Sequence, residues 1–251
     1  MRQVPLTKPF FALLGQGRVG RALAAYLSAR NLSYQTLPRQ RALDEILSPR
    51  APFSAVLLAV SDSAIPELVS SLGACPVPIV HFSGSVRVEG ARAFHPLYSF
   101  TDRALSVAEF ETIPFIADPG SAAHFSDIFP AFVNPVIEMS RARDARYHAL
   151  CVLLGNLPLL IQDRAARALE RDYGLPRKAC VPFLESLVSN FSASTATSSP
   201  DSLVAGPVAR RDVETTAAHL DAVADDPLMG ALYRLLVEDR WPEYPTERKR
   251  P

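Results

Sequence analysis

The chain has 251 residues, of which 48% are hydrophobic and 21% charged, a composition typical of folded globular proteins rather than disordered ones. Its 26 basic and 26 acidic side chains balance, whereas proteins that bind nucleic acids usually carry a basic excess. We therefore expect no nucleic-acid partner. The three cysteines are widely spaced and the five histidines include no close ligand pair, so we expect neither a disulfide framework nor a metal site.

The N-terminal part of the chain alternates predicted strands with predicted helices. Short apolar or β-prone runs predict buried strands at residues 10–14, 33–37, 55–60, 78–82 and 112–117. Helical spacing of apolar residues predicts helices at 19–30 and 65–72, with Ser61 and Asp62 as N-cap residues of the second. This alternation predicts an α/β fold with a doubly wound Rossmann sheet.

The pattern changes after about residue 134, where strand signals end and apolar residues recur at helical spacing. Helices are predicted within residues 141–172, 176–190, 213–223 and 228–237. We therefore expect a nucleotide-binding domain at residues 1–138 and an all-helical domain at 139–251. The apolar run at 151–161 is too short for a membrane span and no signal-peptide core is visible, so we expect a cytoplasmic protein with no membrane partner.

A glycine motif follows the first predicted strand and opens the first predicted helix. Its residues are Gly15, Gln16, Gly17, Arg18, Val19 and Gly20, with the pattern G-x-G-x-x-G. The first glycine permits a tight turn, the second lets a pyrophosphate approach the backbone, and the third allows the helix to lie close to the strand. The helix N-terminus offers N–H groups and the positive end of its dipole to phosphates. This context favours a dinucleotide site over a plain glycine turn.

The segment about 20 residues beyond this motif bears on the choice of cofactor. Sites that prefer NAD usually place an acidic side chain there, on the ribose hydroxyl. Here the segment holds Arg39 and Arg41 and no acid. An arginine can pair with a 2′-phosphate through charge-assisted hydrogen bonds. We therefore predict NADP as the cofactor, with NAD as an alternative; the other interpretation of the two arginines is a solvated basic loop.

Seven segments carry a wider resemblance, in order over about four fifths of the chain. They are Gly15 to Gly20, Val60-Ser61-Asp62, residues 81–85 (HFSGS), 94–100 (FHPLYSF), 146–149 (RYHA), Asn156 and 206–212 (GPVARRD). Through them the chain resembles a family of oxidoreductase-like proteins with a Rossmann-like N-terminal domain and a helical C-terminal domain of unknown function. More distantly, it is similar to the superfamily of prephenate dehydrogenase, pyrroline-5-carboxylate reductase and 6-phosphogluconate dehydrogenase.

The resemblance implies a nicotinamide-binding fold and a homodimer, and it assigns Val60, Ser61 and Asp62 to the cofactor site. It supplies no substrate. Family members commonly have Arg-Gly-Asp where this chain has Arg210, Arg211 and Asp212. A side chain on Arg211 would crowd any turn that needs glycine.

His95 is the first candidate for chemistry. Prephenate dehydrogenases have a similar His-Pro element, so the resemblance implies that His95 is a general acid/base in hydride transfer. The ordinary pKa of histidine, near 6.5, suits that task. The alternative is a histidine that holds a loop by hydrogen bonds. A catalytic lysine of the hydroxyacid dehydrogenases would lie four residues before Asn156, where this chain has Val152, so that mechanism is not carried over.

Other polar residues are candidates for substrate contact. Ser83 and Ser85 follow a predicted strand, and ligands of open α/β sheets bind beyond the C-terminal strand ends. His148 and Asn156 are eight residues apart, which puts them on roughly the same face of a helix. Arg210 could clamp a substrate carboxylate, while Asp212 is expected to cap a helix. Asn156 could equally be a helix-interior amide that bonds the neighbouring domain.

The leading prediction is an NADP-dependent oxidoreductase that acts on a small polar substrate, with a carboxylated molecule as one option. His95, Ser83 and Asn156 are the predicted catalytic residues. The predicted substrate-binding residues are Ser85, His148 and Arg210. The absent lysine keeps open a non-catalytic sensor that binds a dinucleotide and regulates a partner. A further alternative is a Rossmann protein that binds another nucleotide.

Overall fold

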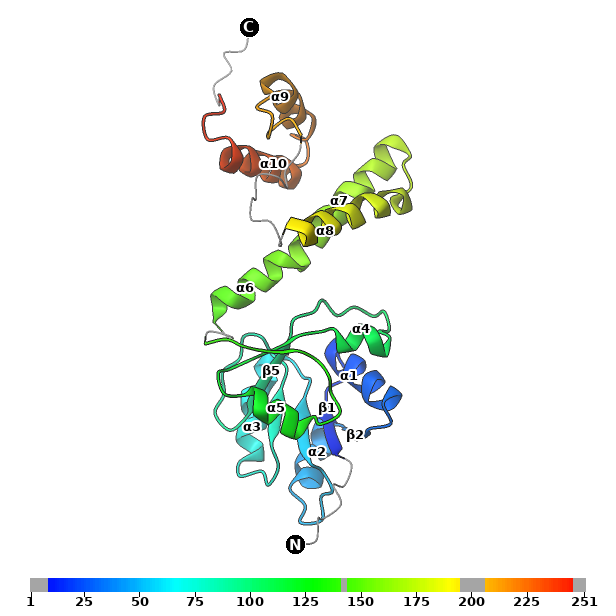
Figure 1. Ribbon diagram of the computed structural model, residues 1–251, viewed down its shortest axis with the longest axis vertical. Coiled ribbons are helices and arrows are strands. Elements are labelled where there is room, and N and C mark those ends of the chain that lie inside the picture. The colour runs from blue at the N-terminus through cyan, green and yellow to red at the C-terminus, as the bar shows by residue number, and fades with distance from the viewer. Residues whose placement is uncertain (1–8, 141–143, 195–205, 246–251) are drawn as a thin grey trace. The chain divides into compact units, whose positions relative to one another are not determined.

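The computed structural model describes residues 9–140, 144–194 and 206–245. By its internal contacts the chain divides into two compact units, Met1–Leu157 and Pro158–Pro251. The first contains a sheet with helices on both faces, and the described part of the second is helical (Figure 1). The predicted assignment of residues 1–138 to nucleotide binding and 139–251 to a separate helical domain stays a prediction.

A seven-stranded sheet in the order β2-β1-β3-β4-β5-β6-β7 forms the centre of the first unit. The strands are β1 (Phe10–Leu14), β2 (Ser33–Leu37), β3 (Ala55–Leu58), β4 (Ile79–His81), β5 (Arg92–Pro96), β6 (Phe115–Ala117) and β7 (Val136–Glu138). Neighbouring strands are parallel except β5 and β6, which are antiparallel. A mostly parallel sheet with alternating helices confirms the predicted fold class, and the antiparallel pair is the departure from a purely parallel sheet.

Helices connect the strands and continue beyond the sheet. In the first unit they are α1 (Arg18–Ala29), α2 (Arg39–Ile46), α3 (Ile65–Leu72), α4 (Val107–Glu111), α5 (Ala122–Ile128) and α6 (Ala145–Leu154). The later helices are α7 (Asn156–Tyr173), α8 (Val181–Ser194), α9 (Val213–Ala222) and α10 (Pro227–Arg240). Two short 3-10 turns, η1 (Asp62–Ala64) and η2 (Arg177–Cys180), precede α3 and α8.

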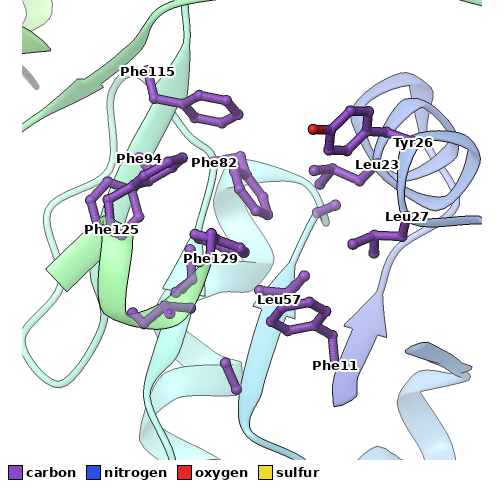
Figure 2. Close-up of a cluster of buried hydrophobic side chains, with 14 of the residues drawn as sticks. Phe11, Leu23, Tyr26, Leu27, Leu57, Phe82, Phe94, Phe115, Phe125 and Phe129 are labelled. Carbon is purple, nitrogen blue, oxygen red and sulfur yellow. The ribbon is translucent and has the colours of Figure 1, made fainter. Parts of the chain in front are cut away.

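The core lies on both faces of the sheet because successive side chains of a strand point to opposite faces. In β1, Phe11 and Leu13 lie in one buried cluster with α1 and α5, while Ala12 and Leu14 lie in another with α2 and α3. Figure 2 shows the first cluster, in which Phe11 lies among aromatic and aliphatic side chains of three other elements. Burial on both faces explains why the central strands are continuously apolar.

Several predicted elements are confirmed and several were missed. The strands at 10–14 and 33–37 and the helix at 65–72 have the predicted bounds. β5 was missed because it begins with the exposed Arg92 and ends in Pro96, and proline has no N–H for a ladder hydrogen bond. The segment of Arg39 and Arg41 belongs to α2 rather than a loop. The predicted caps are wrong: Ser61 precedes η1 with no side-chain cap bond, and Ala64 lies at the N-cap of α3.

The helical stretch Ala145–Tyr173, formed by α6 and α7, is long and apolar enough to cross a membrane. The mean hydropathy of an 18-residue window within it is 1.2. The expectation from the sequence considered only the apolar run at 151–161 and missed this longer helical stretch. One such helix is weak evidence for a membrane span by length and composition alone, and none of this window is buried inside the structure.

Side-chain pairs tie the helices of the second unit together. Arg177 in η2 forms an ion pair with Asp163, so the chain turns back along α7 before α8 begins. Arg164 of α7 donates two hydrogen bonds, of 2.7 and 2.9 Å, to Asp226 at the N-cap of α10. Asp212 is the N-cap of α9 and accepts a hydrogen bond from the Thr215 N–H, which confirms its predicted role.

Candidate functional site

A cavity of about 500 Å³ lies at the C-terminal ends of β1, β3 and β4. The sheet order changes direction at β1, since β2 lies on one side of it and β3 on the other. Such a switch point is where open α/β sheets bind ligands. The residues lining this switch-point cavity are Gly15, Gln16, Gly17, Arg18, Val19, Leu58, Ala59, Val60, Ser61, Asp62, Phe82 and Ser83. Eight predicted cofactor residues therefore line one cavity: five of the glycine loop and three that follow β3.

Each of the three glycines of the loop has a different structural role. Gly15 has a φ of +106°, and a Cβ there would lie 2.0 Å from the carbonyl oxygen of Ala59. A Cβ on Gly20 would lie 2.3 Å from the carbonyl oxygen of Gly15, so glycine is needed where α1 passes the strand end. A Cβ on Gly17 would meet nothing within 4 Å. Gly15 and Gly20 therefore shape the turn, and Gly17 leaves open space for a ligand.

The N-terminus of α1 faces this loop without a side-chain cap. Its N-cap is Gly17, which has no side chain to accept a bond from the first N–H groups. Those groups and the positive end of the helix dipole suit an anion such as a phosphate. This is the arrangement a pyrophosphate requires, and it fits the predicted role of the loop.

Arg39 and Arg41 are placed by the register of β1 and β2. Leu14 pairs with Leu37, so the first turn of α2 lies beside the start of the glycine loop. Arg39 forms an ion pair of 2.6 Å with Glu67 of α3, and Arg41 forms one of 2.7 Å with Glu45 of α2. The side chains of both arginines are largely exposed, so these two ion pairs contribute little to the stability of the fold. Neither arginine is among the described residues that line the switch-point cavity.

The turn after β4 holds a network of three polar side chains. Ser83 Oγ accepts hydrogen bonds of 3.1 Å from the N–H groups of Ser85 and Val86, which closes the turn. Ser85 Oγ donates a 2.5 Å hydrogen bond to Asp62 Oδ2 in η1. The turns after β3 and β4 are thus joined at the edge of the switch-point cavity. The predicted contacts of Ser83 and Ser85 with cofactor or substrate remain predictions.

A second cavity, of about 320 Å³, lies between the end of β5 and α6. We call it the histidine cavity. Its lining residues are His95, Leu97, Tyr98, Ser99, His148, Cys151, Val152, Leu154, Gly155 and Asn156. Three residues predicted as catalytic or substrate-binding, His95, His148 and Asn156, therefore meet in one place. His95 lies within β5, a strand that the sequence did not predict.

His95 and His148 both lie against the glycine that follows Ser83. A Cβ on Gly84 would come within 2.9 Å of His148 Nδ1 and of both Cε1 and Nε2 of His95. The two imidazole rings have centroids 6.2 Å apart. His148 Nδ1 is buried and has no hydrogen-bond partner among the described residues. His95 Nδ1 is hydrogen-bonded at 2.8 Å to the hydroxyl of Tyr147.

The two cavities adjoin at the turn after β4. Ser83 lines the switch-point cavity, and the next residue, Gly84, contacts the two histidines that line the histidine cavity. The two candidate sites are therefore linked by consecutive residues of one turn.

The described lining of the histidine cavity has no Asp, Glu, Lys or Arg side chain, but a charged network holds Tyr98 at one side of it. The Tyr98 hydroxyl accepts a 3.2 Å hydrogen bond from Arg103, which also forms a 2.9 Å ion pair with Glu109. Glu109 is the third residue of a capping box with Ser106 at the start of α4. The backbone N–H of Ser106, then its hydroxyl and Arg103, lower the pKa of Glu109 to about 2.

Arg210 lies in the second unit, in the turn before α9, and is exposed. Its predicted clamp on a substrate carboxylate stays a prediction. Arg211 has a φ of +56°, the left-handed region that glycine adopts most easily. Arg211 therefore adopts a left-handed backbone conformation at the position where the family commonly has glycine. Among the described residues no group of three or more His, Cys, Asp or Glu side chains could hold a metal ion.

Three residues of the site were not predicted. Tyr147 lies in a segment that carried the resemblance, but nothing in its neighbours predicts the bond to a strand 52 positions earlier. Gly84 was visible as part of a Ser-Gly-Ser turn, without the two rings that require it. Tyr98 could have been linked to the S-x-x-E capping box at 106–109, a helix-start pattern that was overlooked.

Comparison with known proteins supports the fold described above. Residues 115–239 match the protein family described as a domain of unknown function, DUF2520. No curated protein matches the sequence. A Bacteroides fragilis protein described provisionally as an NADP oxidoreductase is 21% identical, with 93% of this chain and 98% of that chain covered and a TM-score of 0.72.

Two enzymes of known class have the same fold. An imine reductase of Streptomyces aurantiacus is 14% identical, with 92% of this chain and 93% of that chain covered and a TM-score of 0.57. The Plasmodium falciparum pyrroline carboxylate reductase, solved with NADP bound, is 13% identical, with 92% and 96% covered and a TM-score of 0.55. The resemblance predicted from the sequence is thus confirmed at the level of fold. The chain therefore shares the Rossmann-like fold of these proteins, and residues 115–239 match the DUF2520 family model.

Proposed function

We propose that this protein is an NADP-dependent oxidoreductase that transfers hydride between the nicotinamide and a small polar substrate. The observation that carries the proposal is the turn Ser83-Gly84, which belongs to the wall of the switch-point cavity and also contacts His95 and His148. Hydride transfer requires the cofactor and the substrate to meet at close range. A cofactor site and a proton-transfer site that share one turn satisfy this requirement.

The residues present fit the cofactor. The open backbone at Gly17 and the N-terminus of α1 would hold the pyrophosphate, and Val60 to Asp62 would line the path toward Ser83. Arg39 would exchange Glu67 for the 2′-phosphate, a stronger anionic partner than an exposed carboxylate. NADPH, when bound, supplies the hydride.

The protein supplies the proton and the orientation. His95 would give a proton to the oxygen or nitrogen of the group being reduced, or accept one in the reverse direction. His148 and Asn156, which line the same cavity, would bind polar atoms of the substrate. Arg210 is proposed to pair with the carboxylate of a carboxylated substrate.

One observation favours a second function, a sensor that binds a dinucleotide without turning it over. Val152 lies in the wall of the histidine cavity at the position where the hydroxyacid dehydrogenases have their catalytic lysine. A sensor would bind NADPH tightly and reduce none of a broad set of ketones, aldehydes and imines. An enzyme would oxidise NADPH with at least one of them, and His95→Asn would lower kcat by about 100-fold or more.

The first experiment is a titration of the full chain with NADPH and NADH, followed by nicotinamide fluorescence. We expect NADPH to bind more tightly, and Arg39→Asp to weaken NADPH binding by about 10- to 100-fold with NADH affected by less than about threefold. Arg50→Asp, the same charge change at an exposed position outside the site, is the matched control. Equal effects of Arg39→Asp on both cofactors would contradict its role, and binding of neither cofactor would contradict the function.

We also propose that the protein is a homodimer, as the resemblance implies. α8 exposes Phe183 and Leu187, four residues apart on one face, and Val188 beside them. Soluble monomers rarely leave such apolar groups together in solvent, and a second copy would cover them. Light scattering on the full chain should give twice the mass of 27.4 kDa, and Phe183→Asp should give the monomer mass. A wild-type monomer would contradict this proposal.

A further inference from the structure

Tyr147 lies at the start of α6, beside His148, and its hydroxyl is 2.8 Å from His95 Nδ1. The two rings meet edge to face, with centroids 5.8 Å apart and planes at 90°. The hydrogen bond and the ring contact together fix both the position and the rotation of the imidazole. The pair joins β5 to α6 beside His148, which lines the histidine cavity.

We propose that Tyr147 is the positioning residue of His95, whose hydroxyl holds the ring with Nε2 toward Gly84 whether or not the imidazole carries a second proton. The inference rests on the proposed function, because it assigns how the proton donor of that reaction is held. It adds a residue and a reason that neither the sequence patterns nor the fold supply.

A hydroxyl oxygen is suited to this task because it accepts a hydrogen bond without adding a negative charge. When His95 is neutral with its proton on Nδ1, Nδ1 donates to the Tyr147 hydroxyl oxygen and Nε2 can accept a proton. When His95 is an imidazolium, Nδ1 still donates to the same oxygen and Nε2 can give its proton. A carboxylate would hold the same nitrogen but favour the charged ring more strongly, and an N–H donor would favour the neutral ring with its proton on Nε2, which cannot accept a proton there. Tyr147 therefore keeps the ring in place through a complete cycle of proton transfer.

The opposite edge of the ring determines where the proton is exchanged. Cε1 and Nε2 of His95 are the atoms nearest to Gly84. Gly84 follows Ser83, which lines the switch-point cavity. With Nδ1 held by Tyr147, Nε2 is the nitrogen at the turn that the two cavities share, so proton transfer to the substrate is assigned to Nε2.

The second unit contains a similar pair that serves as an internal control. The Tyr233 hydroxyl is 2.7 Å from His219 Nδ1, with ring centroids 5.7 Å apart and planes at 82°. Neither residue is among those that line the two cavities. Tyr147→Phe and Tyr233→Phe therefore remove the same kind of bond, one inside the candidate site and one outside it.

The test uses the full chain labelled with ¹⁵N-histidine, which contains five histidines. Long-range ¹H–¹⁵N spectra report the tautomer and protonation of each ring, and His95→Asn identifies the His95 signals. We expect neutral wild-type His95 to show the single tautomer with its proton on Nδ1, and Tyr147→Phe to replace it with a mixture of tautomers. Tyr233→Phe should change His219 only. His95 signals that are the same in Tyr147→Phe and wild type would overturn the proposal, whatever the activity.

Kinetics with a substrate found by the screen supply the second readout. Tyr147→Phe should lower kcat by about 10- to 100-fold and leave the KM for NADPH within about twofold. In the His95→Asn background, Tyr147→Phe should have no further effect, because its role acts through the ring that is already gone. Full additivity of the two losses would overturn the positioning role. Absence of any turnover would contradict the proposed function, and the spectra would still decide whether Tyr147 holds His95.

Discussion

Gly84 lies so close to His95 that no side chain fits between them: a Cβ on Gly84 would be 2.9 Å from both Cε1 and Nε2 of the imidazole. The glycine is therefore required by the approach of a ring rather than by its own backbone, since Gly84 is not among the glycines with positive φ. This close approach brings the turn after β4 against the histidine cavity. It makes Gly84 a position where the site can be perturbed without altering the sheet.

Gly84→Ala should displace the two histidines and leave the fold intact. Alanine suits the backbone at this position, and the atoms that it meets belong to side chains that can rotate away. We expect changed ¹⁵N signals for His95 and His148, a loss of turnover, and NADPH affinity within about threefold of wild type. Thermal unfolding measures the fold directly. Unchanged histidine signals would mean that the rings do not lie against Gly84.

The glycine loop gives a matched pair of substitutions. Gly17→Val introduces a side chain into open space, so stability should stay within about 0.5 kcal/mol of wild type while NADPH binding weakens by about 100-fold or more. Gly15→Val should destabilise the protein by about 2–4 kcal/mol, because of the positive φ and the contact with Ala59. Urea unfolding and cofactor titration separate the two effects. Unchanged NADPH affinity in Gly17→Val would refute the assigned site.

Arg211→Gly should stabilise the second unit. A non-glycine residue in the left-handed region costs about 1–2 kcal/mol, partly offset by the greater freedom of glycine in the unfolded chain. The ion pair of Arg211 with Glu243 is exposed and contributes little. We expect a gain of about 0.5–1 kcal/mol in the free energy of unfolding. Arg210→Gly, at a neighbour without positive φ, is the control and should show a loss.

Glu109→Gln should change how stability depends on pH. The folded protein lowers the pKa of Glu109 from 4.5 to about 2, chiefly through the hydrogen bond from the Ser106 N–H. A lowered pKa stabilises the folded state above the unfolded pKa, and this stabilisation is lost as pH falls through the folded pKa. Wild type should therefore lose more stability than Glu109→Gln between about pH 5 and pH 2. Parallel curves of unfolding free energy against pH for the two proteins would contradict this assignment.

Local patterns were sufficient for the cofactor half of the site. β1, the glycine loop and α1 are consecutive, and continuous burial, a tight turn and helical spacing each leave a mark within 20 residues. The same holds for β2 and α3, whose predicted bounds agree with the structure. The strands β5 and β7 were not predicted because they lack such local signals. β5 begins with the exposed Arg92 and ends in Pro96, and two of the three residues of β7 are exposed, so neither segment shows a continuous apolar run.

What the sequence by itself determined is therefore the Rossmann-like fold, the helical C-terminal region and the loop suited to a pyrophosphate, because these depend on neighbours along the chain. Only the tertiary structure decided that Gly84, His95 and Tyr147 meet, since they come from a turn, a strand and a helix that are far apart in sequence. Contacts of this kind depend on strand order and on the angle at which a helix passes the sheet. No local periodicity encodes them, so His95 was visible as a candidate while the two residues that hold it were not.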